Sequence, residues 1–137
     1  MMNINNFVRQ HEAIHESIKD IESLIARNNI ENDSFEIAKN INVLTGILKV
    51  HLQSEDKFLY PQLLKSNDIK LKNTAEEYID EMGDISIEFE KYKIKFNTKN
   101  KINEDVENFK RCTAEIIKVL KNRLDKEDKY LYPLIKQ

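Results

Sequence analysis

The segment HLQSEDKFLYP (His51–Pro61) is nearly repeated later in this chain of 137 residues, as RLDKEDKYLYP (Arg123–Pro133). The repeat retains Glu-Asp-Lys-aromatic-Leu-Tyr-Pro, whereas the leading His becomes Arg. In a helix, side chains four residues apart lie one above the other, so Glu55 and Glu127 share a face with those leading residues. A buried charge must be paired or bound to a metal, so the repeat indicates a polar site inside a helical core.

The apolar residues around the two copies recur at steps of three and four, which is the period of an α-helix. Two glycines and two prolines are the only residues of these types, so little interrupts long helices. The pattern predicts four helices. Their inward residues are Phe7, Ile14, Ile18, Ile21 and Ile25; Ile37, Ile41, Leu44 and Leu48; Leu71, Ala75, Tyr78, Met82, Ile85, Phe89, Tyr92 and Phe96; and Phe109, Cys112, Ile116 and Val119 or Leu120.

The breaks between these patterns are short and polar. We predict that the first helix ends near residues 28–29, that Ser34 caps the start of the second, and that the second reaches or kinks at Pro61. The polar run 97–101 is expected to be a loop. Short connections favour antiparallel neighbours, so the expected fold is all-α, an up-down-up-down antiparallel four-helix bundle forming a single domain over residues 1–137.

Composition excludes several classes of protein. The 22 basic and 24 acidic residues are interleaved, so no basic stripe indicates a nucleic-acid partner. No apolar stretch is long enough to span a membrane. A single Cys112 excludes an intrachain disulfide and fits a reducing compartment, and residues 1–9 lack the apolar run of a secretion signal. We therefore expect a cytoplasmic protein.

The inward stripes also pass through polar or unusual residues near one end of the predicted bundle. These are His11 on the first helix, His51 and Glu55 on the second, Met82 on the third, and Arg123 and Glu127 on the fourth. Counting from the helix ends predicts two layers about one turn, or ~5.4 Å, apart. One layer holds His15, His51, Met82 and Arg123, and the other holds His11, Glu55 and Glu127. All three histidines thus converge with two carboxylates, a donor set that suits iron, zinc or manganese.

This arrangement resembles the hemerythrin-like family, also called the HHE cation-binding domain. The resemblance rests on His11 within Gln10–Ile14 and on the segments His51–Pro61 and Arg123–Pro133, and it covers essentially the whole chain. It implies a four-helix bundle around a non-haem, carboxylate-bridged di-iron centre that binds oxygen or senses oxygen, redox state, iron or nitric oxide stress. A full centre of that kind uses more histidines than the three present here, and the usual third- and fourth-helix histidines are Met82 and Arg123 in this chain.

We therefore predict a metal-binding protein with an altered ligand set. His51, Glu55 and Glu127 would bind the metal together with His11, His15 or both. The expected cofactor is iron, in a di-iron or mononuclear site; another divalent metal, or none, is the alternative. Open coordination positions would suit a small diatomic ligand or peroxide, in a monomer or a homodimer. Sensing or handling of oxygen, redox signals, nitric oxide or iron is expected rather than bulk oxygen transport. Nothing in the sequence marks the substrate pocket of an enzyme.

The residues beside the predicted ligands leave a metal-free interpretation of the site open. Arg123 could neutralise Glu55 and Glu127 in place of a metal, which would make the protein a metal-free regulatory or protein-interaction bundle. Glu127 is accordingly either a bridging ligand or the partner of Arg123. Met82 is expected to fill the core, because a thioether is a poor ligand for ferric iron. Tyr60 is expected to close the end of the bundle with its ring.

Overall fold

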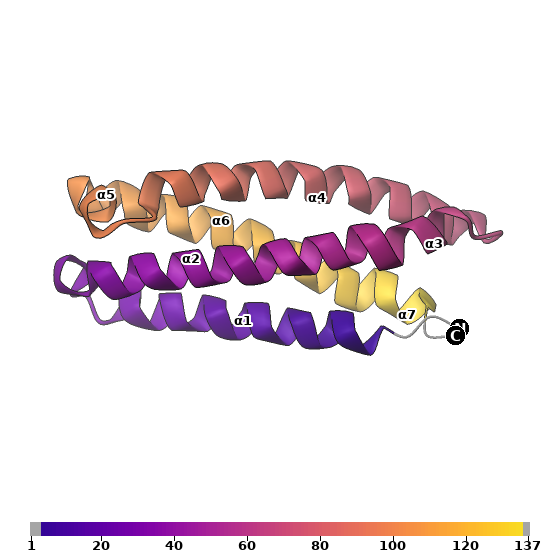
Figure 1. Cartoon of the computed structure of the whole chain (residues 1–137), viewed down its shortest axis with the longest axis horizontal. Coiled ribbons are helices and arrows are strands. Elements are labelled where there is room, and N and C mark those ends of the chain that lie inside the picture. The colour runs from indigo at the N-terminus through magenta and orange to yellow at the C-terminus, as the bar shows by residue number, and fades with distance from the viewer. Residues whose placement is uncertain (1–3, 136–137) are drawn as a thin grey trace.

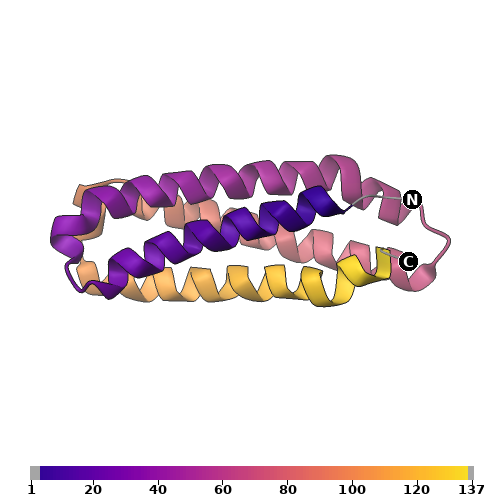
Figure 2. The ribbon, with the colours of Figure 1, turned by 90° about the horizontal axis from the view of Figure 1, so that it is seen from below.

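Four long helices lie side by side in the computed structural model, which describes residues 4–135 (Figure 1). They are α1 (Asn5–Ala26), α2 (Ile30–Ser54), α4 (Ile69–Phe96) and α6 (Val106–Lys126). Consecutive long helices run in opposite directions in both views (Figures 1 and 2). The described residues form helices and turns without any strand, so the prediction of an all-helical protein is confirmed. No helix of this described part is both long and apolar enough to cross a membrane.

Each copy of the repeated segment contains the same departure from α-helical geometry. A π-helical turn, η1 (Glu55–Leu59), joins α2 to the short helix α3 (Tyr60–Leu64), and η2 (Glu127–Leu131) joins α6 to α7 (Tyr132–Ile135). The backbone N–H of each tyrosine bonds to the carbonyl of the glutamate five residues earlier. This wider turn places residues five apart on one face, so the glutamate and the tyrosine of each copy both face the core.

The proline that follows each tyrosine explains where the π-turns lie. Pro61 and Pro133 have no backbone N–H and would interrupt the hydrogen bonds of a continuous α-helix. At the first turn of a new helix the missing donor costs little, and α3 and α7 begin one residue before these prolines. The second helix therefore changes geometry just before Pro61.

The buried apolar side chains form two clusters. The larger one fills the bundle around Ile14, Leu48 and Leu124, and the smaller one packs around Phe7, Leu59 and Leu131. His11, His51, Glu55 and Glu127 fall between members of the two clusters along their helices. The polar residues are thus enclosed within the bundle between two apolar layers, rather than placed at its open end.

Two local predictions differ from the structure. α2 begins at Ile30, because Asn28 adopts the left-handed backbone conformation (φ 59°) that turns the chain sharply. Ser34 therefore lies inside the helix, buried, with its hydroxyl donating to the carbonyl of Glu31. The expected loop 97–101 is largely replaced by the short helix α5 (Lys99–Glu104), which Thr98 caps through its side chain.

The inward face of α6 differs by one position from the predicted stripe. Thr113 and Ile117 are buried, Cys112 and Ile116 are half-buried, and Val119 is exposed. A hydrogen bond of 2.7 Å between the Thr113 and Tyr92 hydroxyls satisfies the polar group that the sequence pattern treated as outward.

Candidate metal centre

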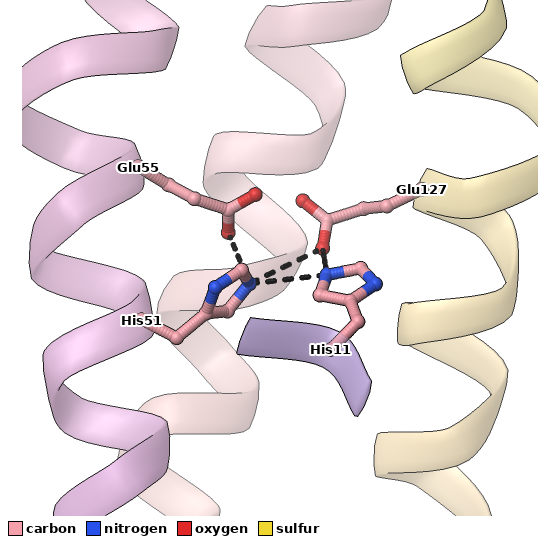
Figure 3. A group of neighbouring side chains, drawn as sticks. All are labelled: His11, His51, Glu55 and Glu127. Atoms are coloured by element: carbon pink, nitrogen blue, oxygen red, sulfur yellow. Dashed lines mark hydrogen bonds and ion pairs between the residues drawn. The ribbon is translucent and has the colours of Figure 1, made fainter. Parts of the chain in front are cut away.

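Four side chains from three segments converge inside the bundle (Figure 3). α1 contributes His11, the end of α2 and the start of η1 contribute His51 and Glu55, and the start of η2 contributes Glu127. One nitrogen or oxygen from each lies within 4.8 Å of all the others. All four residues are buried, with exposed fractions of 0 to 2%. The structure thus brings His51 of one predicted layer together with the whole of the other layer, His11, Glu55 and Glu127.

The shortest distances within the cluster join Nε2 and Oε1 atoms. His11 Nε2 lies 3.1 Å from His51 Nε2 and 3.1 Å from Glu127 Oε1. His51 Nε2 lies 3.2 Å from Glu55 Oε1 and 3.9 Å from Glu127 Oε1. Both imidazoles therefore turn the same ring nitrogen toward the two carboxylates.

Partners outside the cluster fix which ring nitrogen carries the proton. His51 Nδ1 lies 2.7 Å from Gln10 Oε1, and His11 Nδ1 lies 2.9 Å from Asp128 Oδ1. An amide oxygen and a carboxylate oxygen can only accept, so each Nδ1–H donates. The neutral rings then present Nε2 lone pairs to the cluster, which is the arrangement found around histidines that bind metals.

The donor chemistry of the four residues fits a divalent cation. Two nitrogen lone pairs and two carboxylate oxygens face one another, and all four are hydrogen-bond acceptors when the imidazoles are neutral. Glu55 Oε1 is buried and has no hydrogen-bond partner among the described residues. Such an arrangement of buried acceptors is unfavourable unless a proton or a metal ion lies among them. Imidazole and carboxylate together suit iron, zinc or manganese.

The electrostatics of the metal-free cluster show the same need for positive charge. Burial alone would lower the pKa of His51, but the carboxylates of Glu127 and Glu55 outweigh burial and raise this pKa to about 9. Burial and the charge of Glu127 raise the pKa of Glu55 to about 8. Burial would also raise the pKa of Glu127, but hydrogen bonds from His11 and His51 lower it well below its ordinary value. Without metal, protons on His51 and Glu55 reduce the repulsion between the acids.

Two tyrosines complete the surroundings of the glutamates. The Tyr60 hydroxyl donates to Glu127 Oε2 at 2.7 Å, and the Tyr132 hydroxyl donates to Glu55 Oε2 at 2.9 Å. Tyr132 also lies 3.1 Å from His11 Nε2 through its hydroxyl. Tyr60 therefore packs in the smaller apolar cluster as expected, and its hydroxyl also reaches the predicted site.

One of the five predicted metal ligands, His15, lies outside the cluster. His15 is exposed, because it follows the buried Ile14 by one residue and so lies about 100° round the helix from it. Arg123 is buried, and among the described residues it forms no ion pair with either core glutamate. Its guanidinium pairs with Glu81 and lies over the Tyr78 ring, with Cζ 4.7 Å from the ring centre. Its long side chain places the guanidinium against α4 rather than beside Glu55 and Glu127. Met82 is buried, as expected for a core residue.

Sequence reasoning missed Gln10 and Asp128. Gln10 precedes the predicted ligand His11 but supports the other histidine, and Asp128 follows the predicted ligand Glu127. The sequence offered a single indication of their role, which is that each residue is adjacent in the chain to a predicted ligand.

Comparison with known proteins identifies the family. A family model described as the hemerythrin HHE cation-binding domain matches residues 2–135, nearly the whole chain. Searches among curated proteins and among solved structures gave no match. The buried histidine and glutamate cluster lies within the matched region. The chain belongs to the hemerythrin HHE cation-binding domain family.

Proposed function

We propose that this protein binds a divalent transition metal, foremost iron, through His11, His51, Glu55 and Glu127. The observation that carries the proposal is the convergence of four buried acceptor atoms within 4.8 Å of one another. The two Nδ1–H groups are already engaged by Gln10 and Asp128, so both Nε2 lone pairs are directed at the same small volume.

We further propose that the centre binds or senses a small diatomic molecule or peroxide, or senses iron or redox state, in the cytoplasm. Iron held there would supply a coordination position for such a molecule and a change of oxidation state. The protein provides a site enclosed between two apolar clusters, which excludes bulk water. Asp128 connects His11 to the surface, because its side chain is 40% exposed. The Nδ1–H of His11 is therefore linked to solvent through Asp128, while Nε2 faces the core.

The metal-free alternative depended on Arg123 as the counter-ion of the core glutamates. The ion pair of Arg123 with Glu81 directs this charge elsewhere. Burying two acids with two imidazoles and no cation is costly, which favours the metal-binding proposal.

Two histidines of α1 provide a matched test. The full chain, freed of metal with a chelator, is titrated with Fe²⁺ without oxygen and with Co²⁺ and Zn²⁺, while heat capacity and unfolding are followed by calorimetry. Metal should raise the unfolding temperature, because a ligand that binds only the folded state stabilises it. His11→Ala should abolish this rise, whereas His15→Ala, at an exposed position outside the cluster, should retain it. Folded wild-type protein whose unfolding temperature none of the metals raises would refute the proposal.

A further inference from the structure

The two oxygens of each core glutamate have different partners. Glu55 Oε1 and Glu127 Oε1 face the histidines, at 3.2 Å from His51 Nε2 and 3.1 Å from His11 Nε2. Glu55 Oε2 and Glu127 Oε2 instead accept hydrogen bonds from Tyr132 and Tyr60. Each carboxylate thus offers one oxygen to the metal site and gives the other to a phenol.

The hydrogen bonds cross between the two copies of the repeat. The tyrosine of the first copy, Tyr60, binds the glutamate of the second, and Tyr132 of the second copy binds Glu55 of the first. Both tyrosines follow a π-turn, which places their hydroxyls on the inward face together with the glutamates. The sequence repeat therefore generates two reciprocal hydrogen bonds, Tyr60 to Glu127 and Tyr132 to Glu55, which we call the clamps.

Packing fixes both hydroxyls in place. Tyr60 and Tyr132 are 3% and 2% exposed, and their rings belong to the smaller apolar cluster. A phenol that faces an ionised carboxylate can only donate, so both hydroxyls are the donors of these hydrogen bonds. A buried donor facing a carboxylate is costly to displace, because it would lose a charged acceptor.

A glutamate that bridges two metal ions gives one oxygen to each. A second ion would need to approach the Oε2 atoms to about 2.0–2.2 Å, the usual length of a bond between a metal and a carboxylate oxygen. The phenol hydroxyls already lie 2.7 and 2.9 Å from these atoms. On the proposed function stated above, we propose that Tyr60 and Tyr132 are positioning residues that limit the centre to one divalent metal ion.

Metal stoichiometry tests the inference directly. Wild-type protein dialysed against Co²⁺ should hold about one ion per chain, measured by elemental analysis. The double variant Met82→His/Arg123→His adds imidazoles at the two positions where the family resemblance leads us to expect histidines, and it should still hold one ion, because the clamps remain. Adding Tyr60→Phe and Tyr132→Phe to it should allow a second ion to bind. A second ion bound while both tyrosines are present, or a folded fourfold variant that holds one ion, would overturn the inference.

A spectroscopic measurement keeps the test decisive if the fourfold variant does not fold. The visible absorption of bound Co²⁺ reports the number and geometry of its ligands. Tyr60→Phe and Tyr132→Phe should each change this spectrum, because the freed Oε2 atom can also reach the ion. Tyr92→Phe is the matched control, since its hydroxyl bonds to Thr113 in the larger apolar cluster, and it should leave the spectrum unchanged.

The outcomes separate the two proposals. Identical Co²⁺ spectra in wild type, Tyr60→Phe and Tyr132→Phe would overturn the role of the tyrosines. Two ions bound to the wild type would also overturn it, although metal binding itself would stand. Folded wild-type protein that takes up no Co²⁺, Fe²⁺ or Zn²⁺ would overturn the proposed function instead.

Discussion

The two copies of the repeated segment share a backbone but differ in the chemistry of their side chains. Both run from α-helix through a π-turn into a short helix that carries Tyr-Pro, and both bury a glutamate and a tyrosine. The leading residue differs: His51 faces the cluster, whereas Arg123 pairs with Glu81 on α4. A symmetric scaffold thus surrounds an asymmetric centre.

A second difference lies one residue after each glutamate. Asp128 accepts a hydrogen bond from His11, whereas Asp56, at the equivalent place in the first copy, contacts no histidine among the described residues. The reason is that His11 of α1 lies against the second copy, where its Nδ1 reaches Asp128. Each copy therefore contributes a carboxylate to the cluster, whereas the two imidazoles of the cluster come from α1 and the first copy.

The largest effect should follow from exchanging the leading residues for apolar ones. His51→Ala removes one of two nitrogen donors and should lower Co²⁺ affinity by at least about 100-fold, since residues that only orient ligands are already worth 10–100-fold. Arg123→Leu should change affinity little and cost about 1–3 kcal/mol of unfolding free energy, because Glu81 loses its buried partner. Isothermal titration and chemical denaturation measure the two quantities. Equal losses of affinity in both variants would show that the copies contribute alike.

The sequence was informative wherever helical period alone decided the outcome. Glu55 and Glu127 continue the inward stripes, and the structure buries both. The period could not decide between His11 and His15, which lie only about 40° apart round a helix. Nor could it find the contact of Asp128 with His11, because this contact depends on how far one helix is shifted along another. The partner of Arg123 was missed because a long, flexible side chain can reach several acids.

The π-turns also lay beyond the sequence pattern. The one extra residue of a π-turn does not change the spacing of apolar residues enough to be recognised. In both copies, however, the π-turn begins at a glutamate five residues before the tyrosine of a Tyr-Pro pair. The consequence is functional, because without these turns Tyr60 and Tyr132 would point away from the face that carries the glutamates.

An intermediate effect should distinguish the two aspartates. Asp128→Ala removes the acceptor for His11 Nδ1–H and should lower Co²⁺ affinity by about 10–100-fold. Asp56→Ala occupies the same place in the other copy and should change affinity by less than about threefold, within the range of surface substitutions. Asp128→Asn should restore much of the loss, since the amide oxygen can still accept. Calorimetric titration of the three variants decides the matter; an Asp56→Ala loss as large as that of Asp128→Ala would contradict the asymmetry.

The smallest effect should be a pH dependence confined to the first copy. In the metal-free fold the pKa of His51 is raised from 6.5 to about 9, so the folded state holds its proton more tightly than the unfolded chain does. This contribution is complete below pH 6.5 and is lost as the pH rises through 9. The pKa of Glu55, raised from 4.5 to about 8 mainly by burial, acts with the same sign, because protonation favours the folded state.

Arg123 in the second copy keeps its charge over this whole range, so no matching contribution comes from there. Thermal unfolding in the presence of a chelator should therefore show a midpoint that falls by several degrees between pH 6.5 and pH 9. Saturating Co²⁺ should flatten this fall, because the ion replaces the protons that the cluster would otherwise lose. His51→Gln should reduce the fall in the metal-free protein and leave the part that Glu55 contributes, while Arg123→Leu should leave the slope unchanged. A midpoint that rises between pH 6.5 and pH 9 in the metal-free wild type would contradict the sign predicted for both His51 and Glu55.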